Sequence, residues 1–291
     1  GADNGIGVAT ALALLEMAAD ARLPPLECLF TVDEETGLTG AFALDGALLR
    51  GRTMLNLDTE EWGAICIGCA GGGDSELALP VSREASPGDY LSFQLSVEGL
   101  MGGHSGVNIH EYRANAIVLL ASLLEPLATI GARLISVRGG DKTNAIPREA
   151  FATLLLPPEA MADAQIAVGA RTAALQAEFG TLETGMRVML SGLDDAPAEC
   201  LSAGAQDSLL GLLRALPHGV LKYSHAIPGL VETSNNLASV AADGDSYRIV
   251  CSSRSSIMEA LEDVRGRIAT IAALCGATAT RSSSYPGWQP N

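Results

Sequence analysis

The sequence predicts an α/β protein in which a partial, mostly parallel sheet with helices is interrupted by a large inserted α+β domain. Near the start, an Ala- and Leu-rich helical pattern at 9–19 alternates with two short apolar runs, 26–32 and 53–57. This order of helix, strand, helix and strand is typical of a parallel sheet that is buried on both faces. After residue 73 the pattern changes to alternating strands around long helices, which indicates an α+β unit.

The α+β part contains two runs of elements in a similar order, so we expect two ferredoxin-like halves. The first run has strands at 90–97, 133–138 and 151–156 and a helix at 111–124; the second has helices at 163–178 and 258–274 and strands at 186–190 and 247–252. Loop residues at 285–290 then lead back out of this domain. The predicted domains are therefore 1–72, 73–284 and 285–291.

Composition excludes several classes of protein. The chain has 291 residues, 48% of them hydrophobic, so a sizeable buried core is expected. The net charge of −16 disfavours nucleic acid and anionic membranes as partners. No apolar run reaches the roughly 18 to 20 residues that a membrane helix needs. We expect neither a nucleic-acid partner nor a membrane partner.

The six cysteines are scattered, which fits a reducing compartment and favours a cytoplasmic protein. Cys66 and Cys69 form a CxxC pair. A structural zinc site would need a second pair, and a redox motif would need a helix starting there. We therefore interpret the two residues as a buried thiol pair.

Four acidic residues are candidates for a shared site. Asp3 lies in a glycine-rich loop before the first helix, Glu34 and Glu35 follow the first predicted strand, and Asp58 follows the second. Ligand sites of open α/β sheets form at strand ends, and carboxylates that converge there repel one another unless cations neutralise them. Divalent metal ions are the economical solution, with one residue of the Glu34–Glu35 pair as a ligand and the other as a general base. Alternatively, Asp3 caps the following helix and the other acids are solvated. Because no histidine precedes His104, the metal could also be magnesium.

Three polar residues of the middle domain are candidates for substrate contacts. His104 lies in a glycine-rich turn that exposes its imidazole, and such a group could polarise a carbonyl oxygen. Asn144 and Arg254 offer an amide and a guanidinium, which suit the polar atoms and the terminal carboxylate of a peptide. A hydrogen-bonded surface histidine, a turn asparagine and a surface arginine explain the same spacing equally well.

Seven short motifs, which include most of these candidate residues, occur along the chain in a fixed order. They are GADNG at 1–5, TVDEETG at 31–37, NLDTEE at 56–61, GCAGG at 68–72, GGHSG at 102–106, NAIPREA at 144–150 and YPGWQP at 285–290. Together they resemble the bacterial aminoacyl-histidine (Xaa-His) dipeptidases, which belong to the co-catalytic zinc peptidases. The resemblance implies a zinc-peptidase catalytic domain with an inserted lid domain, two divalent metal ions, most simply zinc, and a dipeptide substrate such as Xaa-His or β-alanyl-His.

Position by position, the resemblance implies that Asp3 bridges the metals, Glu35 and Asp58 each ligate one of them, and Glu34 is the general base for metal-activated water. It also implies that His104 reaches the scissile carbonyl and that Asn144 and Arg254 hold the substrate. Relatives carry an upstream His-x-Asp motif and a later metal-ligating histidine that this sequence does not contain, so we expect the chain to be part of a longer protein. Both a monomer and a homodimer are compatible with the sequence.

Two other functions remain open from the sequence. An N-acyl amino acid or a longer peptide could replace the dipeptide, because fold and metals are shared while specificity resides in the lid. The chain could also be a catalytically inactive binding or assembly module.

Overall fold

The computed structural model describes residues 4–17, 22–34, 38–58, 63–195 and 197–289. Contacts divide the chain into two compact units, Gly1–Cys66 and Ile67–Asn291. The predicted mixed α/β class is confirmed, with helices alternating with the strands of a large sheet. Residues 69–72 were expected with the first part, but within the larger unit they pair with residues 285–288: Cys69 bridges Trp288, and Gly72 bridges Tyr285.

The first unit contains short helices and extended chain. Helix α1 spans Gly5–Met17, helix α2 spans Thr39–Phe42, and a 3-10 turn spans Gly46–Leu48. The helix predicted at 9–19 thus begins earlier, because the Asn4 side chain accepts a hydrogen bond from the Gly7 amide (3.0 Å) and caps the first turn.

The predicted parallel strands of this unit are not formed within its described residues. Neither 26–32 nor 53–57 joins a backbone ladder there. Their side chains are largely exposed; Val32 is 68% exposed and Leu55 82%. A strand requires a neighbour for its amide and carbonyl groups, and a parallel strand also requires cover on both faces. Apolar composition alone provides neither a neighbouring strand nor cover on both faces, so it does not make these two runs strands.

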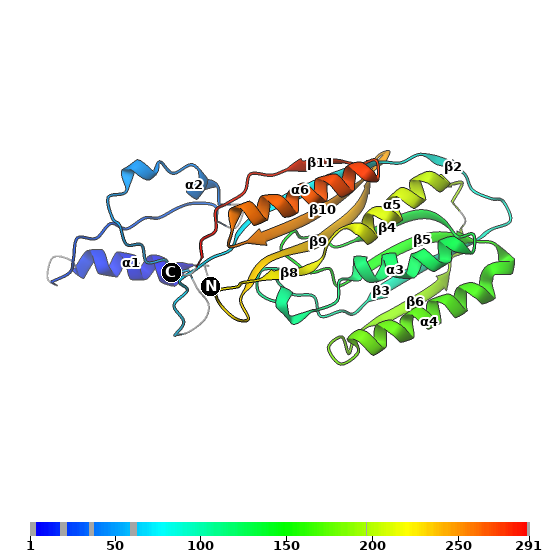
Figure 1. Cartoon of the computed structure of the whole chain (residues 1–291), viewed down its shortest axis with the longest axis horizontal. Coiled ribbons are helices and arrows are strands. Elements are labelled where there is room, and N and C mark those ends of the chain that lie inside the picture. The colour runs from blue at the N-terminus through cyan, green and yellow to red at the C-terminus, as the bar shows by residue number, and fades with distance from the viewer. Residues whose placement is uncertain (1–3, 18–21, 35–37, 59–62, 196, 290–291) are drawn as a thin grey trace. The chain divides into compact units, whose positions relative to one another are not determined.

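The second unit is built on a nine-stranded sheet whose described pairings are all antiparallel (Figure 1). The order is β11-β1-β10-β9-β4-β5-β3-β6, and β8 pairs with β9. The strands are β1 (Gly71–Pro80), β3 (Leu91–Glu98), β4 (Arg133–Gly139), β5 (Ala150–Leu156), β6 (Arg187–Gly192), β8 (Gly219–Tyr223), β9 (Val231–Asp243), β10 (Ser246–Ser255) and β11 (Thr278–Arg281). A separate two-stranded ribbon joins β2 (Arg83–Ala85) to β7 (Glu199–Leu201).

Two β-α-β-β-α-β halves make up this sheet, and one is nested inside the other. The first half runs β3-α3-β4-β5-α4-β6, and the second runs β1-α5-β9-β10-α6-β11. Each places its strands in the same relative order, and the two meet where Gly139 of β4 pairs with Val240 of β9. The sequence predicted two successive runs and placed the helix at 163–178 and the strand at 186–190 in the second. In the structure α4 and β6 belong to the first half, and β1 of the second half precedes that whole first half. That arrangement depends on the pairing of β1 with β10 and β11.

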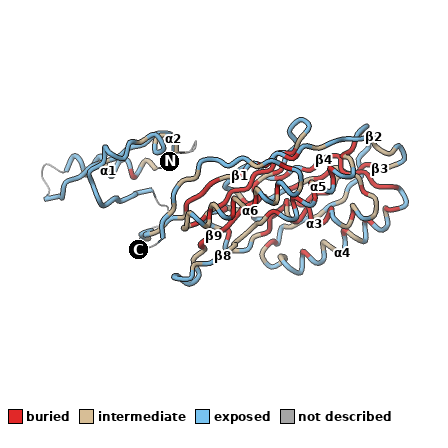
Figure 2. The backbone as a smooth tube through the Cα atoms, turned by 45° about the horizontal axis from the view of Figure 1, so that its top comes forward, coloured by how far each residue is buried: buried red, intermediate tan, exposed pale blue. Residues whose placement is uncertain are grey.

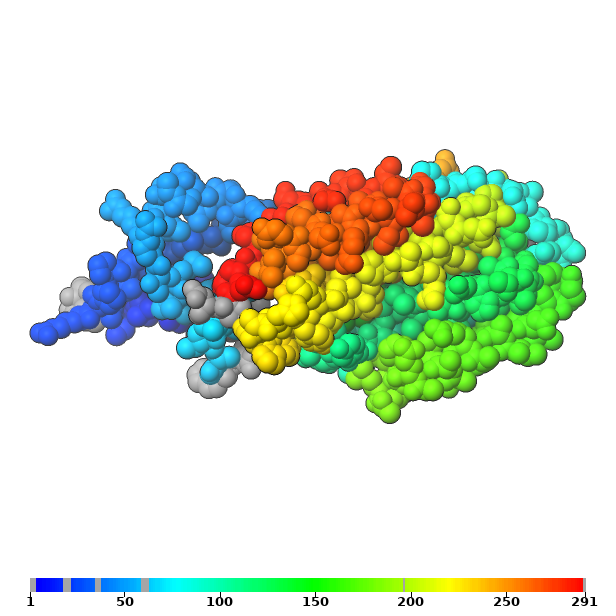
Figure 3. Space-filling model, viewed as in Figure 1, coloured from blue at the N-terminus to red at the C-terminus, as the bar shows by residue number. Residues whose placement is uncertain are grey.

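Four long helices lie on one face of the sheet (Figure 1), and Figure 3 shows the atoms of the same face in space-filling form. They are α3 (Ala116–Thr129), α4 (Met161–Phe179), α5 (Ala203–Ala215) and α6 (Met258–Leu274), and a 3-10 turn at Pro158–Ala160 leads into α4. Figure 2 shows the buried residues following the strands and helix α3. In the described part of the chain, no helix combines the length and apolarity needed to cross a bilayer.

Helix α3 begins five residues later than the predicted start at 111. A 3-10 turn occupies Ile109–Glu111, and Tyr112 has a left-handed conformation (φ 56°) that no helix continues. Asn115 then caps α3 by accepting hydrogen bonds from the amides of Ile117 (2.9 Å) and Val118 (3.3 Å). The apolar residues 116–124 nevertheless form the core helix that the sequence predicted.

Polar contacts tie the two halves together. The buried Tyr247 hydroxyl of β10 accepts a hydrogen bond from the Val137 amide of β4 (3.1 Å). The Asn115 amide group donates to the Leu237 carbonyl of β9 (2.8 Å). Burial raises the pKa of Tyr247, so this hydroxyl stays protonated at neutral pH. Strand β10 is thereby joined to β4, and the start of α3 to β9.

Candidate functional site

The acidic residues predicted for the metal site belong to the first unit. Glu34 and Asp58 are exposed, while Asp3 and Glu35 lie outside the described residues. Asn4, next to Asp3, donates to the carbonyl of Leu57, next to Asp58 (2.8 Å). The hydrogen bond therefore joins the start of the described chain to the segment that carries Asp58.

The local backbone around the acids is constrained. Asp33, immediately before Glu34, has φ 55°, a conformation that aspartate tolerates better than most residues. The Glu34 carbonyl accepts a hydrogen bond from the Leu38 amide (3.0 Å), and the Asp58 amide donates to Asn56 Oδ1 (2.8 Å). The described residues contain no group of three or more potential metal ligands. The donor chemistry of the candidates is purely carboxylate, which fits a hard or borderline divalent cation.

His104 lies in the loop that follows β3. Gly102 (φ 64°) and Gly103 (φ 126°) adopt conformations that favour glycine, and His104 forms an isolated bridge with Ala145. The Gly106 amide donates to His104 Nδ1 (3.2 Å). A neutral imidazole that accepts at Nδ1 carries its proton on Nε2. In this tautomer the N–H group of the exposed imidazole is at Nε2.

Asn144 and Arg254 come close to this loop from different elements. The Asn144 carbonyl accepts from the Ser105 amide (2.7 Å), next to His104. Arg254, near the end of β10, lies against the same turn: a Cβ atom on Gly106 would be 3.0 Å from His104 Cε1 and 3.1 Å from Arg254 Cζ. The second unit thus brings together the three residues predicted for substrate contact.

Two side chains that sequence reasoning gave no role support this cluster. Tyr285 Oη accepts a hydrogen bond from Arg254 Nη1 (3.0 Å); its pKa is raised by burial, although the guanidinium of Arg254 lowers it. Asn236 donates to the carbonyls of Thr143 (3.3 Å) and Ala145 (2.8 Å) on either side of Asn144. Tyr285 could have been suspected from the YPGWQP motif, whereas no local signal marks Asn236.

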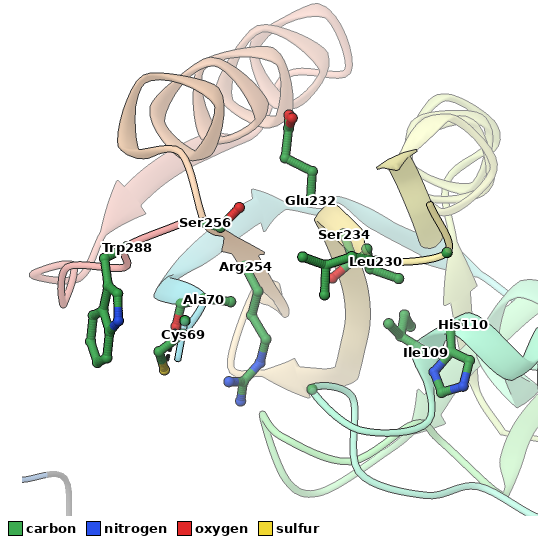
Figure 4. Close-up of a pocket in the computed structure, with 14 residues that line it drawn as sticks. Cys69, Ala70, Ile109, His110, Leu230, Glu232, Ser234, Arg254, Ser256 and Trp288 are labelled. Atoms are coloured by element: carbon green, nitrogen blue, oxygen red, sulfur yellow. Dashed lines mark hydrogen bonds between the residues drawn. The ribbon is translucent and has the colours of Figure 1, made fainter. Parts of the chain in front are cut away.

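A cavity of about 360 Å³ lies beside the cluster (Figure 4). Its volume is within the range of small-molecule sites, about 300 to 1,000 Å³. Arg254 extends between the Cys69–Ala70 segment and the loop of Ile109 and His110, while the Glu232 side chain points away from it. The lining residues are Gly68, Cys69, Ala70, Gly106, Ile109, His110, Gly229, Leu230, Val231, Glu232, Ser234, Arg254, Ser256 and Trp288. One guanidinium and several backbone groups can therefore bind a small polar molecule.

The CxxC prediction was wrong in one respect. Cys66 and Cys69 are both exposed, so they are not a buried thiol pair. Cys69 pairs with Trp288 through its backbone and lines the edge of the cavity. The buried cysteines of the described chain are Cys200 and Cys251 instead.

His218 supports the N-terminus of α3. The Asn115 amide group donates to its Nδ1 (3.2 Å), and burial lowers the pKa of His218 to about 4. Protonation of Nδ1 would place an N–H group against the N–H of Asn115. The histidine is therefore neutral in the folded protein at neutral pH.

We expect stability to fall as the pH decreases from 6.5 to about 4, because only the unfolded chain binds a proton at His218 in this range. The loss is up to about 3 kcal/mol, and it is complete below the folded-state pKa. Urea denaturation across this pH range measures it. The free energy of unfolding should fall less steeply with decreasing pH in His218→Gln than in the wild type. An equal dependence on pH in the two proteins would contradict a lowered pKa of His218.

Comparison with known proteins connects this geometry to a family. Residues 95–181 match the model of the peptidase dimerisation domain. The whole chain is 39% identical to the cytosol non-specific dipeptidase of Escherichia coli (strain K12), of which it covers 60%. It also matches the crystal structure of aminoacylhistidine dipeptidase from Vibrio alginolyticus, with a TM-score of 0.89 and 38% identity, over 100% of this chain and 59% of that one.

The chain therefore spans about three fifths of the length of these relatives. The match to the dimerisation domain lies in the first β-α-β-β-α-β half, from β3 to the turn after α4. The resemblance predicted from the seven motifs is confirmed: along its whole length, this chain is similar to the aminoacyl-histidine dipeptidases.

Proposed function

We propose that the protein hydrolyses dipeptides, including Xaa-His and β-alanyl-His, as a metal-dependent dipeptidase. The observation that carries this proposal is the convergence of His104 and Arg254 on Gly106, beside the cavity of the second unit. An imidazole N–H donor and a guanidinium that both lie against Gly106 suit the scissile carbonyl and the terminal carboxylate of a very short peptide. The names of the two relatives support the same substrate class.

We assign the metal-binding role to Asp3, Glu35 and Asp58, which would hold two divalent ions, most simply zinc. When bound, such ions activate water for attack on an amide carbonyl. Glu34 takes a proton from the attacking water and delivers it to the leaving amine. The His104 Nε2–H group donates a hydrogen bond to the carbonyl oxygen as negative charge develops there.

Substrate is held in this scheme by Asn144 and Arg254. Arg254 binds the terminal carboxylate, and Tyr285 keeps the guanidinium in place through its hydrogen bond to Nη1. Asn144 contributes an amide group from the loop that Asn236 fixes. Of the two expected states, monomer and homodimer, the match to a dimerisation domain favours the homodimer. The name of the E. coli relative supports a cytoplasmic location.

Removal of the Arg254 guanidinium should weaken the binding of dipeptides that carry a free carboxylate. A charged hydrogen bond contributes about 1.5 to 3 kcal/mol, so Arg254→Ala should raise KM about 10- to 100-fold. The measurement compares KM for Ala-His and for its C-terminal amide in the complete gene product. The preference of the wild type for the free acid should disappear in the variant.

Arg267→Ala is the matched control, because Arg267 is 59% exposed on α6 and pairs only loosely with Asp263 (3.6 Å). An equal loss on the acid and on the amide would contradict carboxylate binding by Arg254. An N-acetyl amino acid, included as a third substrate, distinguishes dipeptidase from acylase activity. If the wild type cleaves only that compound, the dipeptide proposal is wrong.

A further inference from the structure

Glu183 is a buried carboxylate in the turn between α4 and β6. It is 2% exposed, and each of its oxygens accepts one backbone hydrogen bond. Oε2 accepts from the Met101 amide (2.7 Å), and Oε1 accepts from the Ala114 amide (2.9 Å). One side chain thus binds two backbone positions that are far from it in the sequence.

Those two positions are the ends of the loop that carries His104. Met101 lies three residues before His104, and Ala114 lies directly before the helix cap Asn115. Within the loop, Arg113 donates to the Gly102 carbonyl (2.7 Å). The loop is therefore closed twice, once from within by Arg113 and once from outside by Glu183.

The turn that carries Glu183 is also docked against the chain that enters this loop. A Cβ atom on Gly99 (φ 75°) would lie 2.2 Å from the Gly185 carbonyl oxygen. The two turns are in backbone contact, so the carboxylate has little freedom to move. Burying a carboxylate is costly unless its oxygens receive hydrogen bonds, and only a group with two acceptor oxygens satisfies both amides.

We infer that Glu183 is a positioning residue that holds the His104 loop in the geometry required for catalysis. This inference rests on the proposed role of His104 in dipeptide hydrolysis. Glutamine has nearly the same shape as glutamate, but only one of its two terminal atoms accepts a hydrogen bond. Its NH₂ group would face a backbone N–H and release one end of the loop.

The test is a double-mutant cycle in the complete gene product. Glu183→Gln should lower kcat about 10- to 100-fold with little change in KM, because small displacements of a catalytic group have effects of this size. In the His104→Ala background, the same substitution should lower kcat no further. An equal loss in both backgrounds would show a general structural role and overturn the inference.

Glu178→Gln is the matched control, since Glu178 is an exposed glutamate on α4 and should leave kcat unchanged. If Glu183→Gln does not fold, Glu183→Asp replaces it in the cycle. Aspartate keeps the charge, but it is one methylene shorter and reaches only one of the two amides. The same absence of an effect in the His104→Ala background is then expected.

A measurement that does not depend on activity separates this inference from the proposed function. In NMR spectra, the imidazole resonances of His104 should shift in Glu183→Gln, while those of the exposed His225 stay in place. Unchanged His104 resonances would refute the positioning role even in an active enzyme. Shifted resonances in a protein that cleaves no dipeptide would support the positioning role and contradict the proposed function instead.

Discussion

Replacement of Glu34 by alanine or glutamine should lower kcat for Ala-His and β-alanyl-His by about 10²- to 10⁴-fold, the contribution expected of a general base. Neither side chain accepts a proton from water, whereas Glu34 does so in the proposed mechanism. Because the neighbouring Glu35 is the proposed ligand, metal content should change little. Steady-state kinetics and elemental analysis of the complete gene product, with zinc added, measure both quantities.

Glu16→Gln is the control for this experiment, because Glu16 is an exposed acid on α1 in the same unit as Glu34. Full activity in Glu34→Gln would eliminate Glu34 as the base. Loss of metal together with activity would make Glu34 a ligand rather than a base. If neither the wild type nor the variant cleaves dipeptides while metal is bound, N-acyl amino acids become the substrates to test.

The second large effect concerns His104. His104→Ala should lower kcat about 10²- to 10³-fold with KM nearly unchanged, since removal of one donor to a developing oxyanion has this effect. The Nε2–H group is defined by the Gly106 amide, which occupies Nδ1. His104→Gln retains a side-chain N–H and should recover part of the loss.

His225→Ala is the matched control, because His225 is an exposed histidine of the same unit. A rise in KM without loss of kcat in His104→Ala would indicate ground-state binding instead of stabilisation of the transition state. Equal effects of the two substitutions would remove His104 from the mechanism.

Local sequence patterns located several of the helices and strands, but gave no element at α5 or β9 and two N-terminal strands that are not formed in the described residues. The helix predicted at 258–274 coincides with α6, and the strand predicted at 151–156 differs from β5 by one residue. Residues 116–124 form a core helix as expected, because helical periodicity and apolar composition are properties of the segment itself. The start of α3 was missed because it depends on a cap at Asn115 and a left-handed Tyr112.

The candidate site could be predicted only in part. The sequence identified His104 and Arg254 as candidates. It did not show that both lie against Gly106, because they are about 150 positions apart in the sequence. Glu183 was not suspected, since a glutamate after a helix is usually solvated. Its role became visible only when both of its oxygens were found on the ends of the His104 loop.

By itself, the sequence determined the α/β class, the core helix at 116–124, the acidic character that disfavours nucleic acid, and the resemblance to a dipeptidase family. These follow from composition, periodicity and ordered motifs, which are local along the chain. Only the tertiary structure decided that the two β-α-β-β-α-β halves are nested, with β1 completing the second half. It likewise decided which polar residues share the cavity, because strand pairing and burial depend on partners that are distant in sequence.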